Sequence, residues 1–234
     1  PELNLMEMNK NYMLRSDITM TGTHAPIGTD AAPFTGKFDG MFHEIKDMTL
    51  PTGDATNYSG LFGNTRGAEI ANVGIRDANL SSLDYGGAVI GKAGKGTHVF
   101  NVYNEVTSAT PAATKTIGKS AGGHEVGGII GRMDGGSNPG EEVSLDNAYN
   151  TATIEKNAAG LVGYIQGDSR IYAVYNAGKL NNTTLSQAGY QSMGGTAFIK
   201  EAYTSQGTQL GDTDASLNAY DSYSTSTGKA ELVN

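Results

Sequence analysis

The feature that most constrains the fold is one short word that the chain repeats: two or three apolar residues enclosed by glycines. The copies are GLFG at 60–63, GAVIG at 87–91, GIIG at 128–131 and GLVG at 160–163. Their final glycines are separated by 28, 40 and 32 residues. Self-similarity at intervals of this size is typical of folds in which one supersecondary unit stacks on the next.

A second word alternates with the first, and its centre is a tyrosine. The copies are NVYN at 101–104, NAYN at 147–150, AVYN at 173–176, EAYT at 201–204 and NAYD at 218–221. A weaker copy, IANVG at 70–74, has Gly74 in the tyrosine position. Two words in fixed alternation indicate that the repeat covers most of the chain from about residue 60.

The apolar segments are short, rich in Val, Ile and Tyr, and bounded by turn residues, so they predict strands and not helices. Such units bury an apolar face only by stacking on one another. We therefore predict an all-β fold: a parallel β-helix (β-solenoid) of six or seven coils with extra-helical loops. We expect a single β-helix segment, with leading coils at 1–59 and repeats at 60–234.

Glycine and asparagine recur at fixed places in the two words and predict two structural roles. The chain has 33 Gly and only 6 Pro in 234 residues, without the three-residue period of collagen. We interpret each Gly-apolar-apolar-Gly as a short inward-facing strand whose glycines allow a tight corner. Asn104, Asn150 and Asn176 would form a hydrogen-bonded structural ladder along the solenoid axis.

The tyrosine column, Tyr103, Tyr149, Tyr175 and Tyr203, leaves two alternatives open. Its strands give conflicting cues, because Tyr149 alternates with Leu145 on one face while small apolar residues such as Ala148 mark the other. The rings either stack inside the coil or form an exposed aromatic ladder suited to sugar rings or protein partners. A bend within the strand would reconcile the two faces.

Composition excludes several classes of function. The net charge is −8 and no run of Lys or Arg occurs, which argues against a nucleic-acid partner. The absence of Cys removes disulfides, thiolate catalysis and Cys-ligated zinc. No apolar run reaches the roughly 18 residues that span a bilayer, so we expect no membrane insertion by this segment.

Motifs for catalysis and cofactors are missing, and we predict a non-enzyme without cofactor or metal. Neither HEIKD at 43–47 nor HEVGG at 124–128 completes a zinc-peptidase motif, and no nucleophile elbow occurs. Parallel β-helices also carry polysaccharide-cleaving enzymes, whose clustered acids and bases would here be Asp39, His43, Glu44 and Asp47. On a strand, however, His43 and Asp47 would lie about 13 Å apart. Asp212 and Asp214 would suit calcium, but without EF-hand spacing.

Residues 11–75 carry a more specific likeness: NYMLRSDITM, PIGT, FTGKFDGMFHEIKDMTL, GLFG and IANVGI follow one another in that order. This set resembles the GLUG-repeat segments of large bacterial surface proteins. These include two-partner-secretion adhesins of the filamentous haemagglutinin and high-molecular-weight types, and the amino-terminal regions of some IgA-specific metallopeptidases. Met41 to Ile45 departs from the family's usual Asn-Gly-His-Thr-Ile.

The resemblance implies a right-handed parallel β-helix, part of a larger exported protein, that is secreted or displayed on the bacterial cell surface and serves in cell adhesion and virulence. We predict an adhesin segment, expected to be monomeric, that binds a host glycan or surface protein. The alternatives are a purely structural shaft that presents a distal domain, and a polysaccharide-cleaving enzyme. The longest interval between repeats predicts an extra recognition loop, at 107–123 or at 133–142.

Overall fold

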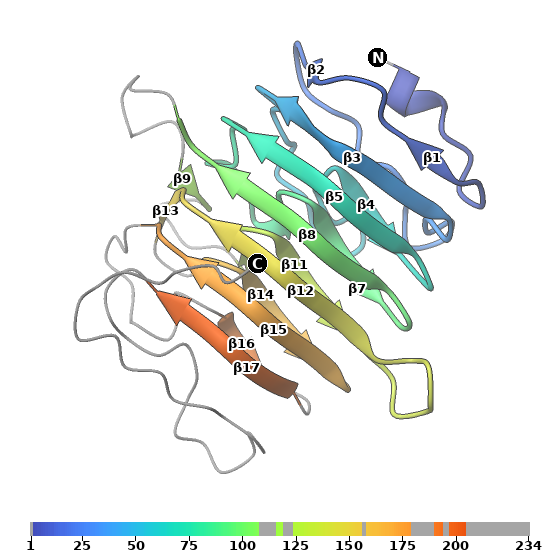
Figure 1. Ribbon diagram of the computed structural model, residues 1–234, viewed down its shortest axis with the longest axis vertical. Coiled ribbons are helices and arrows are strands. Elements are labelled where there is room, and N and C mark those ends of the chain that lie inside the picture. Colours follow the sequence, from blue (N-terminus) through green and yellow to red (C-terminus); the bar gives the residue numbers. More distant parts are fainter. Residues whose placement is uncertain are drawn as a thin grey trace.

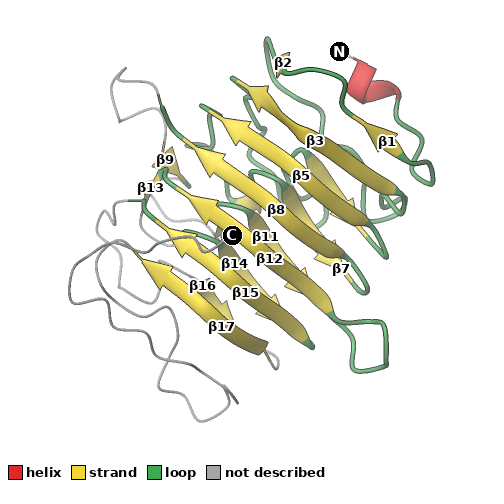
Figure 2. Ribbon diagram, in the orientation of Figure 1, coloured by secondary structure: helices red, strands yellow, loops and turns green. Residues whose placement is uncertain are grey.

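The computed structural model describes residues 2–107, 116–118, 124–155, 158–178, 190–193 and 197–204. Apart from one short 3₁₀ helix, η1 (Glu2–Leu5), every regular element in these ranges is a strand (Figures 1 and 2). No helix in the described ranges has the length and apolar character needed to cross a bilayer. The predicted all-β class is confirmed.

The largest sheet, called the broad sheet below, has eight strands. They are β1 (Tyr12–Met13), β2 (Ile18–Thr19), β3 (Lys37–Lys46), β5 (Glu69–Arg76), β8 (His98–Glu105), β12 (Val143–Asn150), β15 (Ser169–Asn176) and β17 (Ala197–Thr204). β1 and β2 both pair with β3, and every pairing in the sheet is parallel. The strands lie side by side in chain order across the front of Figure 1.

The second sheet lies behind the broad sheet in Figure 1 and has five parallel strands. They are β4 (Phe62–Thr65), β7 (Ile90–Gly94), β11 (Ile130–Asp134), β14 (Val162–Gln166) and β16 (Tyr190–Met193). Two short parallel pairs complete the coil. They are β6 (Tyr85–Gly87) with β10 (Glu125–Gly127), and β9 (Thr116–Ile117) with β13 (Thr153–Ile154).

The chain visits these sheets in rotation, which makes the fold a parallel β-solenoid. The five strands of the second sheet mark about five turns in the described ranges, fewer than the six or seven coils expected. The two sequence words stack in register: Tyr149 pairs with Tyr103 on one side and with Tyr175 on the other, and Tyr175 pairs with Tyr203. One lengthwise core fills the coil, with residues such as Ile70, Val99 and Leu145 fully buried above one another.

Asparagine also stacks inside this core. Asn104, Asn150 and Asn176 are almost completely buried. The Nδ2 of Asn104 donates to the Oδ1 of Asn150 over 2.9 Å, and the Nδ2 of Asn150 donates to the Oδ1 of Asn176 over 2.8 Å. The structure therefore places this column as the expected amide ladder, with one rung per turn.

The glycines of the repeated word serve close packing and not the left-handed backbone. None of Gly63, Gly91, Gly131 and Gly163 has a positive φ. A Cβ on Gly91 would lie 2.5 Å from the Cβ of Tyr58 and 2.6 Å from the carbonyl oxygen of Gly63. Here two backbones approach so closely that only glycine fits. Four of the left-handed glycines, Gly67, Gly96, Gly140 and Gly167, belong instead to the corners that lead into the broad sheet.

Candidate binding face

The outer face of the broad sheet depends on one left-handed residue within each of β5, β8, β12 and β15. Asn72, Asn101, Asn147 and Ala173 have φ between 50° and 54°. On β12, Leu145 is buried, Asp146 is half-buried, and after the left-handed Asn147 the order restarts with Ala148 buried and Tyr149 half-buried. This is the bend that reconciles the two faces. Tyr149 therefore lies on the outer face and not inside the coil.

The same position holds for the rest of the described column. Tyr103 and Tyr175 are half-buried, between inward residues that are fully buried. Tyr203 pairs with Tyr175 through its backbone, and its side chain is outside the described set, as is the fifth copy of the word at 218–221. Phe100 and Tyr172 are half-buried on the same face, one outward row away.

The left-handed residues form a second amide ladder, which sequence reasoning missed. Asn101 donates to Asn72 over 2.9 Å, Asn147 donates to Asn101 over 2.6 Å, and Asn72 donates to Asp39 over 3.0 Å. The signal was the first asparagine of NVYN and NAYN, because asparagine tolerates the left-handed backbone better than most residues. This ladder lies on the surface between the two aromatic rows.

Tyr103 lies across the gap that Gly74 leaves in the tyrosine column. A Cβ on Gly74 would overlap the Tyr103 ring. The phenol oxygen donates to Glu44 on β3, two strands away, over 2.7 Å. The Tyr149 ring stacks on the Tyr103 ring, with centroids 4.9 Å apart and planes 7° apart. The two half-exposed rings are thus fixed in position, and the distance between their centroids matches the distance between neighbouring strands.

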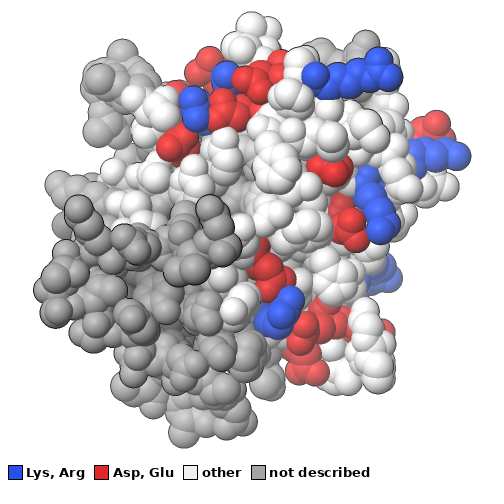
Figure 3. Space-filling view, in the orientation of Figure 1, with Lys and Arg blue, Asp and Glu red and all other residues white. Residues whose placement is uncertain are grey.

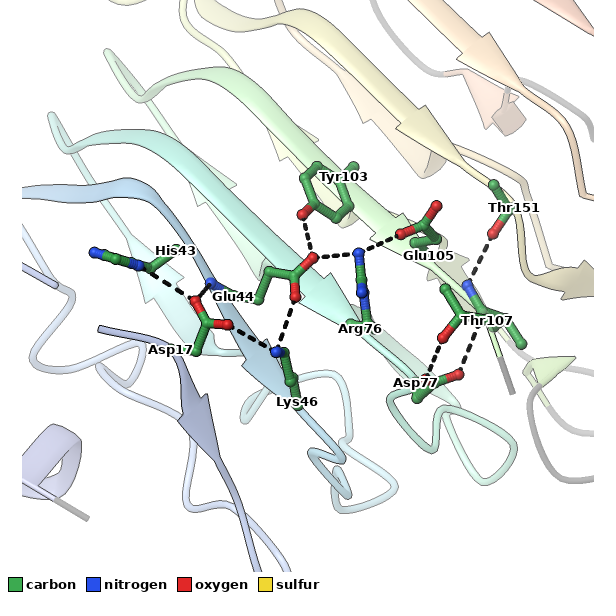
Figure 4. A network of polar contacts seen from close by, with 11 residues as sticks. Asp17, His43, Glu44, Lys46, Arg76, Asp77, Tyr103, Glu105, Thr107 and Thr151 are labelled. Carbon is green, nitrogen blue, oxygen red and sulfur yellow. Dashed lines mark hydrogen bonds and ion pairs between the residues drawn. The ribbon is translucent and has the colours of Figure 1, made fainter. Parts of the chain in front are cut away.

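Glu44 is the centre of a charged network that borders this stack (Figure 4). It accepts from Arg76 over 2.5 Å and from Lys46 over 3.2 Å. Arg76 also binds Glu105 over 2.9 Å, and Lys46 also binds Asp17 over 2.7 Å. The hydrogen bond from Lys46 lowers the pKa of Asp17 to about 2, so this pair stays charged throughout the neutral range.

The phenols of the stack are neutral at physiological pH. Burial, followed by the hydrogen bond to Glu44, raises the pKa of Tyr103, and burial raises the pKa of Tyr149 to about 12. Neutral phenols donate hydrogen bonds and offer ring surface, but they are poor general bases. The chemistry of the face therefore suits recognition.

The acids and base proposed for an enzyme are brought only partly together. His43 binds Asp17 over 3.2 Å, and Glu44 belongs to the network described above. Asp39 caps the second amide ladder, and Asp47 has φ 56° just after the end of β3. Within the described ranges no group of three His, Cys, Asp or Glu side chains would hold a metal ion. Asp212 and Asp214 lie outside these ranges.

The stretch where the sequence departs from the GLUG pattern forms an exposed bulge. Met41 and Phe42 both have a left-handed backbone, with φ 51° and 61°, and their exposed fractions are 48% and 77%. The register against β5 shifts at this point, between Asp39 and His43. The Asp39 carboxylate accepts from the Met41 N–H over 2.8 Å, so the bulge is ordered.

One of the two expected loops lies within the described ranges. The segment 135–142 joins β11 to β12 and projects beyond the sheets at the lower right of Figure 1. It covers a pocket of about 490 Å³ at the edge of the broad sheet where β8, β12 and β15 begin. The lining residues are His98, Gly136, Ser137, Asn138, Pro139, Gly140, Glu142 and Asp168. Most of the other loop, 107–123, lies outside the described ranges.

Figure 3 shows the outer face as a surface. Lys, Arg, Asp and Glu gather mainly along the margins of the broad sheet, with a largely uncharged area between them.

Comparisons with known proteins identify a fold and no family. No family model and no curated protein matches this sequence. The chain is similar to the crystal structure of a protein from Bacteroides ovatus that carries the provisional name immunoglobulin A1 protease, with a TM-score of 0.58 and 20% identity. The match covers 84% of this chain and 60% of that chain. At this identity it shows a shared β-solenoid, and the GLUG resemblance stays a prediction.

Proposed function

We propose that this chain is a non-enzymatic, monomeric adhesin segment of a secreted or surface-displayed bacterial protein, and that it binds a host glycan on the outer face of the broad sheet. The observation that carries the proposal is the Tyr103–Tyr149 stack beside the partly exposed ladder of Asn72, Asn101 and Asn147. Aromatic surface packs against the C–H faces of sugars, and amides hydrogen-bond their hydroxyls.

The state of the polar groups beside the Tyr103–Tyr149 stack supports binding over cleavage at that part of the face. Tyr103 is held protonated beside Glu44, and the carboxylate of Glu44 is already bound by Arg76 and Lys46. A cleaving enzyme needs a base with a pKa near the working pH and an accessible proton acceptor. The fixed rings, by contrast, lose little conformational freedom when a ligand binds, which favours recognition.

A glycan array followed by titration calorimetry tests the proposal. The purified segment is expected to bind at least one class of oligosaccharide, and Tyr149→Ala should weaken that binding about tenfold, the equivalent of about 1.4 kcal/mol. Tyr164→Ala is the matched control, because Tyr164 is half-buried on the second sheet beneath Arg132. Absence of binding at millimolar glycan would favour the structural shaft, and shortening of the oligosaccharides would favour the enzyme.

A further inference from the structure

The pocket under the loop 135–142 has a preorganised wall. The Glu141 carboxylate accepts from Lys95 over 3.2 Å and from Asn138 over 2.9 Å. Its backbone oxygen accepts from the Gly136 N–H over 2.9 Å. The Lys95 and Asn138 hydrogen bonds also lower the pKa of Glu141. The loop is thus tied to the β7 side of the coil and holds its shape without a ligand.

Polar groups line this pocket with few protein partners among the described residues. Among the described residues the Asp168 carboxylate makes no side-chain hydrogen bond, and Glu142 has only a 3.8 Å contact with Arg170. His98 is bound through Nδ1 to the Ser144 hydroxyl over 3.0 Å, which orients its ring at the pocket wall. The pocket therefore offers two carboxylates and an imidazole edge to whatever enters it.

The pocket and the aromatic face are both formed in part by β8. His98 lies two residues before the half-buried Phe100 on β8, and successive outward positions of a strand are two residues apart. A volume of about 490 Å³ suits one or two sugar rings. A ligand that lies along the outer face would reach this pocket where the strands of the broad sheet begin.

We propose that the pocket is a subsite for an uncharged sugar residue of the bound glycan, and that it excludes sialic and uronic acids. Asp168 and Glu142 accept hydrogen bonds from neighbouring sugar hydroxyls, while Phe100 packs against the next ring. An acidic sugar brings a like charge next to two carboxylates of a chain whose net charge is −8, and its binding is opposed. This inference rests on the proposed function and adds the ligand's chemical class.

The experiment uses matched pairs of oligosaccharides, each neutral glycan beside its sialylated counterpart, with amino-sugar versions included. The unmodified segment should bind the neutral member at least tenfold more tightly. Asp168→Ala should weaken neutral binding about tenfold, since a hydrogen bond to a charged acceptor is lost. The double variant Asp168→Asn, Glu142→Gln should reduce the preference for neutral over sialylated glycans, as should high salt.

The outcomes separate this inference from the proposed function. Neutral binding that Tyr149→Ala weakens and Asp168→Ala leaves unchanged would overturn the pocket assignment while the binding face stands. Equal or tighter binding of the sialylated members, or binding of amino sugars alone, would also overturn it. If no glycan in the panel binds at all, both proposals are wrong.

Discussion

Replacement of one rung of the buried amide ladder, Asn150→Ala, should cost much of the stability of the fold. The Asn150 side chain is completely buried and makes four hydrogen bonds. Two bind the neighbouring rungs Asn104 and Asn176, over 2.9 and 2.8 Å, and two bind the backbone of Ala152, over 3.2 and 3.1 Å. At about 1 kcal/mol for each net hydrogen bond, the expected loss is about 4 kcal/mol.

Urea denaturation followed by circular dichroism measures this loss. The control is Asn147→Ala, which removes an exposed amide three residues away on the same strand. Alanine already occupies this left-handed position in the next turn, at Ala173 with φ 53°. The control should therefore lose only about 1 kcal/mol. Equal losses in the two variants would refute the argument that burial makes the inner ladder a major source of stability.

Three further changes have defined outcomes. The double variant Met41→Asn, Phe42→Gly should raise the free energy of unfolding in urea by about 1–2 kcal/mol, because Met41 and Phe42 both adopt a left-handed backbone. A lower free energy of unfolding would contradict strain in the bulge. Gly74→Ala should displace Tyr103 from Glu44, so spectroscopic titration should show the raised pKa of the Tyr103 phenol fall toward 10. An unchanged titration curve would mean that the position of the ring does not depend on the space beside Gly74. Burial lowers the pKa of His24 below 6.5, so the folded state favours the neutral ring. The free energy of unfolding should therefore fall as the pH drops below 6.5, by up to about 1.4 kcal/mol per pH unit. Thermal melts of His24→Gln should show a weaker dependence of stability on pH, and an equal dependence would exclude His24 as its source.

The stacking of the two words could be predicted from the sequence because like residues recur in register. Asn104 and Asn150 lie in corresponding positions of NVYN and NAYN, and a buried column of one amide type satisfies its own hydrogen bonds. The same pattern did not decide the side of Tyr149. A single left-handed residue, Asn147, reverses the two-residue alternation within the strand, and this reversal is a backbone property.

The charged network and the pocket depend on contacts that no local pattern encodes. Tyr103 and Glu44 are 59 residues apart, and they meet because Gly74 leaves room between them. The bulge at Met41 and Phe42 could not be predicted from the sequence either, because neither residue type favours a left-handed backbone. For the loop, spacing predicted an insertion between repeats, but the pocket requires the packing of Asp168 from the next turn.

The binding face is tested most directly by nuclear magnetic resonance of the segment with isotope-labelled tyrosine rings, titrated with an oligosaccharide that it binds. The ring signals of Tyr103 and Tyr149 should shift in proportion to saturation. Those of Tyr58 and Tyr85, which contact each other away from the broad sheet, should stay in place. Saturable binding that moves the second pair and leaves the first unchanged would contradict the account.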